Sequence, residues 1–150
     1  MGSRGNAPAR RTAHGHRRHR LERVAVDDDR ADSFLTLAED TLIDVAHVRL
    51  PQNRYNLAYD AAHALGEALL ARHGYRTRSG PGQHEALSRF LRIVLDTAPH
   101  AADARHFDRM RRARNQMPYE ARPVAAADAD KAARTARALL KAAALPLDHQ

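Results

Sequence analysis

Alanine-rich segments with apolar residues at helical spacing are the feature that most limits what this chain can fold into. Alanine has the highest helix propensity, whereas strands favour β-branched and aromatic residues. The hydrophobic content of 43% owes much to alanine, and aromatic residues make up only 5% of the 150 positions. The sequence therefore predicts an all-α fold, and short connections favour an antiparallel bundle of about five helices.

Five segments carry apolar residues three and four positions apart, which is the spacing of one helical face. They cover approximately residues 33–50, 52–73, 83–97, 101–117 and 128–145, with expected loops at 75–82 and 118–123. We expect Asp32 or Ser33 to cap the first segment and Asp128 to cap the last. Gly74 suits the left-handed position that ends the second segment.

The basic charge of the chain is concentrated near its N-terminal end. The net charge is +7, but residues 1–23 hold seven arginines against Glu22 alone and account for +6 of it. The rest is nearly neutral, which argues against a domain that binds nucleic acid over a broad basic face. We expect residues 1–30 to form a disordered basic tail and residues 31–147 to form the helical domain. The tail either contacts nucleic-acid phosphates or is an extension without a binding role.

The residue types and motifs that the sequence lacks disfavour several classes of protein. Without cysteine, neither disulfides nor thiolate metal sites can form. No run approaches the roughly 18 apolar residues of a membrane-spanning helix, and no apolar secretory signal is visible. Glycine-rich phosphate loops and HExxH motifs are also absent from the sequence. We therefore expect a cytoplasmic protein with no metal, no cofactor and no membrane contact.

One charged residue falls on an apolar face. The predicted helix at 101–117 carries, on one face, Phe107, Met110, Arg114 and Met117. A guanidinium group in such a position is costly unless it is paired or meets a partner or an anion. Arg114 is therefore expected either to form an ion pair across the bundle, for example with Asp60 or Asp44, or to line a cleft or interface.

Three passages, taken in order, resemble the HEPN family of all-α domains from bacterial defence and toxin–antitoxin systems. Residues 55–75 form a tyrosine-containing segment rich in small residues that ends in Gly74-Tyr75. A charged helix ends in Arg112-Ala-Arg-Asn115, and the short segment 119–124 precedes an acidic cap and an alanine-rich last helix. The resemblance covers about residues 32–145 and implies a helical bundle that forms homodimers.

The resemblance also implies a site in which an arginine, often followed by a polar residue, precedes a histidine by four to six intervening residues. In active members this pair lies between two subunits and cleaves RNA without a metal. Arginine can stabilise charge on a phosphate, and histidine can transfer protons near neutral pH. Arg114 and Asn115 match the first half, but positions 119–121 are Tyr119, Glu120 and Ala121. A tyrosine, with a pKa of about 10, is a poor base at neutral pH.

Two functions follow from Arg114, Asn115 and Tyr119 as candidate catalytic residues. The first is a HEPN-like homodimer of toxin–antitoxin or defence type that binds RNA or nucleotides and has a degenerate ribonuclease site. By resemblance, its partner would be a nucleotidyltransferase-type antitoxin. The second is a metal-independent endoribonuclease in which Tyr119, or another residue such as His63 or His106, donates the proton.

Candidate binding residues lie on two of the predicted helices. Arg111 and Arg112 either contact RNA or a partner, or form a solvated face. Tyr59 and His63 lie one helical turn apart and either face the same cleft as Arg114 or belong to the packing. Arg78 and His84 have the same arginine–histidine spacing, but we discount them because both residue types are frequent in this chain.

Overall fold

The computed structural model describes residues 21–97, 99–120 and 123–145. Its elements are, in order, β1 (Leu21–Arg23), α2 (Asp28–Val45), α3 (Pro51–Arg72), β2 (Tyr75–Thr77), α4 (Gln83–Val94), α5 (Ala101–Glu120) and α6 (Ala126–Ala144). Five helices and one small sheet confirm the prediction of an all-α bundle.

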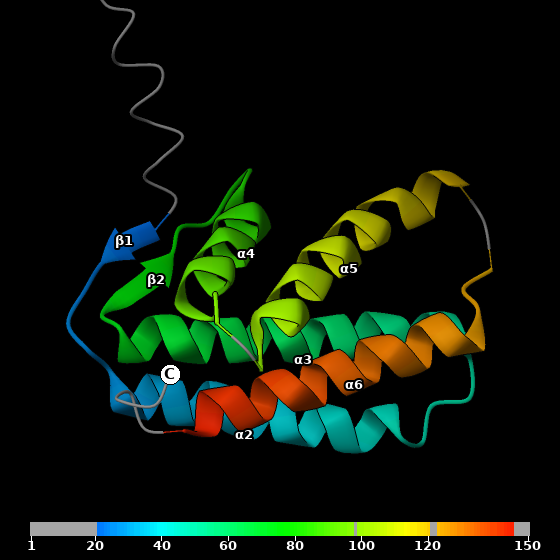
Figure 1. Ribbon diagram of the computed structural model, residues 1–150, viewed down its shortest axis with the longest axis horizontal. Coiled ribbons are helices and arrows are strands. Elements are labelled where there is room, and N and C mark those ends of the chain that lie inside the picture. Colours follow the sequence, from blue (N-terminus) through cyan, green and yellow to red (C-terminus); the bar gives the residue numbers. More distant parts are fainter. Residues whose placement is uncertain (1–20, 98, 121–122, 146–150) are drawn as a thin grey trace, which may run out of the picture.

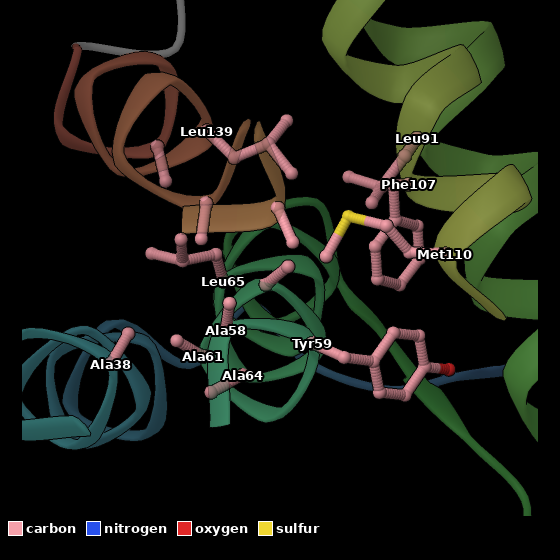
Figure 2. Close-up of a cluster of buried hydrophobic side chains, with 14 of the residues drawn as sticks. Ala38, Ala58, Tyr59, Ala61, Ala64, Leu65, Leu91, Phe107, Met110 and Leu139 are labelled. Carbon is pink, nitrogen blue, oxygen red and sulfur yellow. The ribbon is translucent and has the colours of Figure 1, made fainter. Parts of the chain in front are cut away.

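Helix α3 lies at the centre of the bundle. Helices α2 and α6 run alongside it, while α4 and α5 pack over another side of it (Figure 1). Alanines make these close approaches between helices feasible, because their side chains are small. Figure 2 shows Ala38 of α2 pointing toward Ala61 and Ala64 of α3, all of them buried. The alanine-rich composition therefore serves both helix propensity and packing.

Gly66 of α3 packs tightly against Leu87 of α4. A Cβ atom added at this position would lie 2.8 Å from a methyl carbon of Leu87, whose side chain is fully buried. Only a residue without a side chain fits between the two helices at this point without a shift of Leu87.

The ends of the first and last helices differ from expectation. Helix α2 begins at Asp28, because the Asp27 carboxylate accepts a hydrogen bond of 2.9 Å from the backbone N–H of Arg30. Asp32 and Ser33 therefore lie within the helix rather than at its cap. Helix α6 begins at Ala126 after Ala125, without a side-chain cap, so Asp128 lies in its first turn.

The expected loop at 75–82 and the expected basic tail both contain strand residues. Strands β1 and β2 pair antiparallel, with Leu21 opposite Thr77 and Arg23 opposite Tyr75. The predicted tail, residues 1–30, lies outside the described residues only as far as Arg20. Gly74 has a φ of 79°, which confirms the left-handed turn expected after the second helix.

Helix α5 continues past its expected end at Met117 and includes Pro118. Proline within a helix removes one backbone hydrogen bond and bends the helix, which is why the sequence favoured an end before Pro118. The residues expected to open a loop instead extend α5 by three positions to Glu120.

A buried carboxyl group joins four elements around Glu67 of α3, which is only 3% exposed. Thr77 Oγ1 in β2 donates a hydrogen bond of 2.6 Å to Glu67 Oε1 and accepts one of 2.9 Å from Gln83 Nε2 in α4. Arg30 of α2 places Nη2 4.0 Å from Glu67 Oε2. Burial raises the pKa of Glu67 above its ordinary value of 4.5, although Thr77 and Arg30 oppose the shift.

The raised pKa of Glu67 predicts a pH-dependent effect of Glu67→Gln on stability. As the pH rises above 4.5, the Glu67 carboxyl group ionises in the unfolded chain at a lower pH than in the folded protein. The wild-type protein therefore loses stability until the pH has passed the folded pKa of Glu67. A glutamine does not ionise, so the stability of the variant relative to wild type should increase over this pH range. Urea unfolding followed by circular dichroism at several pH values measures the difference. Glu39→Gln, at an exposed position of α2, is the control; a relative stability of Glu67→Gln that falls with rising pH would contradict the prediction.

Candidate functional site

Arg114 lies at the surface where α5 meets α3. Its guanidinium group forms an ion pair with Asp60 of α3, which confirms the expected pairing across the bundle. The side chains of Arg114 and Asp60 are 36% and 50% exposed. The guanidinium carbon also lies 4.8 Å from the ring centroid of Tyr59, within the range of a cation–π interaction. The arginine is thus held in place but remains accessible to solvent.

Tyr59 connects Arg114 to α4. Its ring is almost fully buried and stacks on Phe107 of α5, with centroids 5.4 Å apart and planes inclined by 5°. Its hydroxyl group shares a hydrogen bond of 2.6 Å with Nδ1 of His84, at the start of α4. Burial raises the pKa of Tyr59 to about 12, although Arg114 and Arg111 oppose the shift. Tyr59 therefore stays protonated at neutral pH and orients the imidazole of His84.

Two histidines lie side by side next to Tyr59. The ring centroids of His63 and His84 are 4.5 Å apart. Burial, with the neighbouring His84, lowers the pKa of His63 to about 4. Burial, with the positive charges of Arg114 and Arg111, also lowers the pKa of His84. These shifts favour the neutral form of both imidazoles. We call Tyr59, Asp60, His63, His84 and Arg114 the Arg114 cluster.

Arg111 and Arg112 are held by a carboxylate on their own helix. Asp108 is 6% exposed and accepts hydrogen bonds from Ser88 Oγ at 2.8 Å, Arg111 Nη2 at 3.0 Å and Arg112 Nη2 at 2.7 Å. Burial tends to raise the pKa of Asp108, but the bonds from Ser88 and Arg111 outweigh it and lower the pKa overall. The two arginines are therefore partly neutralised, and Arg111 is half-buried rather than part of a solvated face.

The structure brings together some of the expected site residues. Arg114, Tyr59 and His63 lie in one cluster, and Arg111 lies close enough to influence the pKa of His84. Asn115 is exposed on α5, next to Arg114 in the chain. The side chain of Tyr119 lies outside what the structure describes, so its expected place beside Arg114 stays a prediction.

His84 is the cluster residue that sequence reasoning set aside. Its spacing from Arg78 gave no reason to place it near Arg114, because the contact depends on how the start of α4 docks against Tyr59. A histidine at the start of a short amphipathic helix was the only local signal. The residue that completes the cluster is thus supplied by tertiary packing.

Neither metal-binding clusters nor membrane-spanning helices occur in the described ranges 21–97, 99–120 and 123–145. No three His, Asp or Glu side chains gather there in a way that could hold a metal ion. No helix in these ranges has the length and apolar character needed to cross a membrane.

Comparison with known proteins identifies no relative. No family model, no curated protein and no solved structure matches the chain.

Proposed function

We propose that this chain is a HEPN-like homodimeric protein of toxin–antitoxin or defence type, and that it binds RNA or nucleotide phosphate at the Arg114 cluster without cleaving it. The observation that carries the proposal is the position of Arg114, which is oriented by Asp60 and Tyr59 but partly open to solvent. A nucleotidyltransferase-type antitoxin remains the partner that the family resemblance suggests.

The contacts of Arg114 support phosphate binding. A phosphate group, like a carboxylate, offers two oxygen acceptors side by side, and arginine can bind either group through two parallel N–H groups. A phosphate oxygen could therefore replace the carboxylate of Asp60, which is itself half exposed. His84 is also exposed and, like the guanidinium group of Arg114, contacts Tyr59, so it can form a second hydrogen bond to the same ligand.

The protonation states in the cluster argue against cleavage. Metal-independent cleavage of RNA requires a proton donor and a proton acceptor whose pKa values lie near the working pH. The pKa of His63 is about 4, which makes it a weak base, and the pKa of Tyr59 is about 12, which makes it a weak acid, so neither value lies near neutral pH. The proposal therefore favours binding.

The second candidate function is a metal-independent endoribonuclease, and one observation favours it. His84 and Arg114 both contact Tyr59, and burial with the charge of Arg114 lowers the pKa of His84, so its neutral imidazole could accept the proton of a ribose hydroxyl. In this alternative Arg114 stabilises charge on the phosphate, and Tyr119 or another residue donates the proton to the leaving oxygen.

Binding is tested by the anisotropy of a short fluorescent single-stranded RNA. Arg114→Gln should weaken binding about tenfold, because hydrogen bonds to charged groups contribute about 1.5 kcal/mol or more. Arg92→Gln, which removes an exposed arginine of α4 outside the cluster, is the matched control and should bind like wild type. Equal binding by wild type and Arg114→Gln would rule out the proposed site.

The same RNA distinguishes the two candidate functions. Wild-type protein incubated with it in EDTA should leave it intact if the site only binds. Cleavage by wild type that is lost in His84→Gln, while anisotropy still reports binding, would establish the endoribonuclease and overturn the binding-only proposal.

A further inference from the structure

A cavity of about 310 Å³ lies between α5 and α6. The residues of its lining that matter here are Tyr55 of α3, His106, Arg109 and Met117 of α5, and Asp128 and Lys131 of α6. Arg114 is not part of this lining, whereas its neighbour Ala113 is. The cavity therefore uses a different face of α5 from the Arg114 cluster.

The charges around the cavity favour an anion. Arg109 and Lys131 bring two positive charges and Asp128 one negative charge, so the ionised groups of this lining sum to one excess positive charge. Burial, with the positive charges of Lys131 and Arg109, lowers the pKa of His106 and so favours its neutral form. The cavity also borders the first turn of α6, which starts without a side-chain cap and whose backbone N–H groups favour negative charge.

His106 provides polar groups that lack a partner. Both of its ring nitrogens are buried, and neither forms a hydrogen bond to any residue that the structure describes. Buried polar atoms are nearly always hydrogen-bonded, so His106 lacks the partners that a buried imidazole usually has. A neutral imidazole can donate one hydrogen bond and accept another.

Most of the remaining wall is apolar. Tyr55 belongs to the lining and is 6% exposed, and burial together with the negative charge of Asp128 raises its pKa to about 12, so its hydroxyl group stays protonated. Met117, a flexible side chain that adapts to different shapes, lies on α5. A mostly apolar wall with a few convergent polar groups is typical of small-molecule sites, and 310 Å³ is within their usual range.

We propose that this cavity binds a small organic anion, whose single carboxylate, sulfonate or phosphate-ester group is held by Arg109 and Lys131 and whose apolar body packs on Tyr55 and Met117. The imidazole of His106 forms part of the cavity wall. The site is separate from the RNA-binding role of Arg114, so either one can fail without the other.

The experiment uses a pair of fluorescent probes that differ in charge. The anionic probe is 1-anilinonaphthalene-8-sulfonate, and the uncharged one is N-phenyl-1-naphthylamine, which lacks the sulfonate. The full chain should bind the anionic probe with one-to-one stoichiometry. Arg109→Gln and Lys131→Gln should each weaken this binding about tenfold, since each removes a charged partner of the sulfonate. The uncharged probe should lose less than about twofold, because its contacts are apolar.

Matched controls separate the cavity from general surface effects. Arg105→Gln and Lys141→Gln remove exposed positive charges of α5 and α6 outside the cavity lining and should leave both probes unaffected. Circular dichroism checks that each variant is folded. The proposal is overturned if the anionic probe does not bind, if it binds Arg109→Gln and Lys131→Gln like wild type, or if both probes weaken equally.

Discussion

Tyr59→Ala is expected to lower the free energy of unfolding by about 3–5 kcal/mol, the usual cost of removing a buried aromatic side chain. The Tyr59 ring is 1% exposed and stacks on Phe107, so its removal leaves a cavity between α3 and α5. The loss of the cation–π contact with Arg114 contributes about 0.5–1 kcal/mol of this. Urea unfolding followed by circular dichroism measures the change.

Tyr59→Phe is the matched control for this variant. It keeps the ring and its packing but removes the hydroxyl group that bonds His84, so the expected cost is only about 1 kcal/mol. Its imidazole partner, His84, is exposed and can bond water instead. A cost for Tyr59→Phe as large as that for Tyr59→Ala would show that the hydroxyl bond, not the stacked ring, stabilises the junction.

Gly66→Ala is expected to destabilise the protein by about 1–3 kcal/mol, the usual cost of overpacking a core. The sign is informative, because replacing glycine by alanine within an exposed helix normally stabilises it by about 1 kcal/mol. Here the new methyl group would lie 2.8 Å from a methyl carbon of Leu87, whose side chain is fully buried in the core. The shift of the urea unfolding midpoint relative to wild type measures the sign and size of the change in stability.

A double-mutant cycle identifies the cause of that effect. Leu87→Ala alone should cost about 2–5 kcal/mol because it leaves a cavity against α3. In that background, Gly66→Ala should become neutral or stabilising, since the added methyl group fills part of the cavity. If Gly66→Ala stabilises the protein when Leu87 is unchanged, the tight packing of Gly66 against Leu87 is contradicted.

The helical architecture could be read from the sequence because its signals are local. Alanine content and apolar spacing predict helices whatever the chain does elsewhere. The predicted ends of the helices were less accurate. Asp27, Asp32 and Ser33 can all cap a helix, and the sequence alone does not show that Asp27 caps α2. The β1–β2 pairing was missed because it joins segments about fifty residues apart, one of them within an arginine-rich stretch.

In the candidate site, too, the sequence indicated the features that depend on local pattern and missed those that depend on tertiary packing. The position of Arg114 on an apolar face indicated that it needed a partner, and Asp60 is that partner. The approach of His84 to Tyr59 depends on the docking of α4, which no local pattern encodes. Equally, Arg111 and Arg112 looked like free positive charge because their sequence spacing from Asp108 did not show that Asp108 is buried against Ser88.

The ion pair between Asp60 and Arg114 has a consequence for how binding would respond to salt. Affinity for nucleic acids falls with salt because each neutralised phosphate releases condensed counterions, about 0.7 per contact for single strands. A phosphate that displaces Asp60 exchanges one anion for another, and the freed carboxylate then gathers cations from solution. Arg114 would therefore contribute a contact while adding little to the salt dependence. Recognition at this junction would depend more on the shape of the ligand than on its total charge.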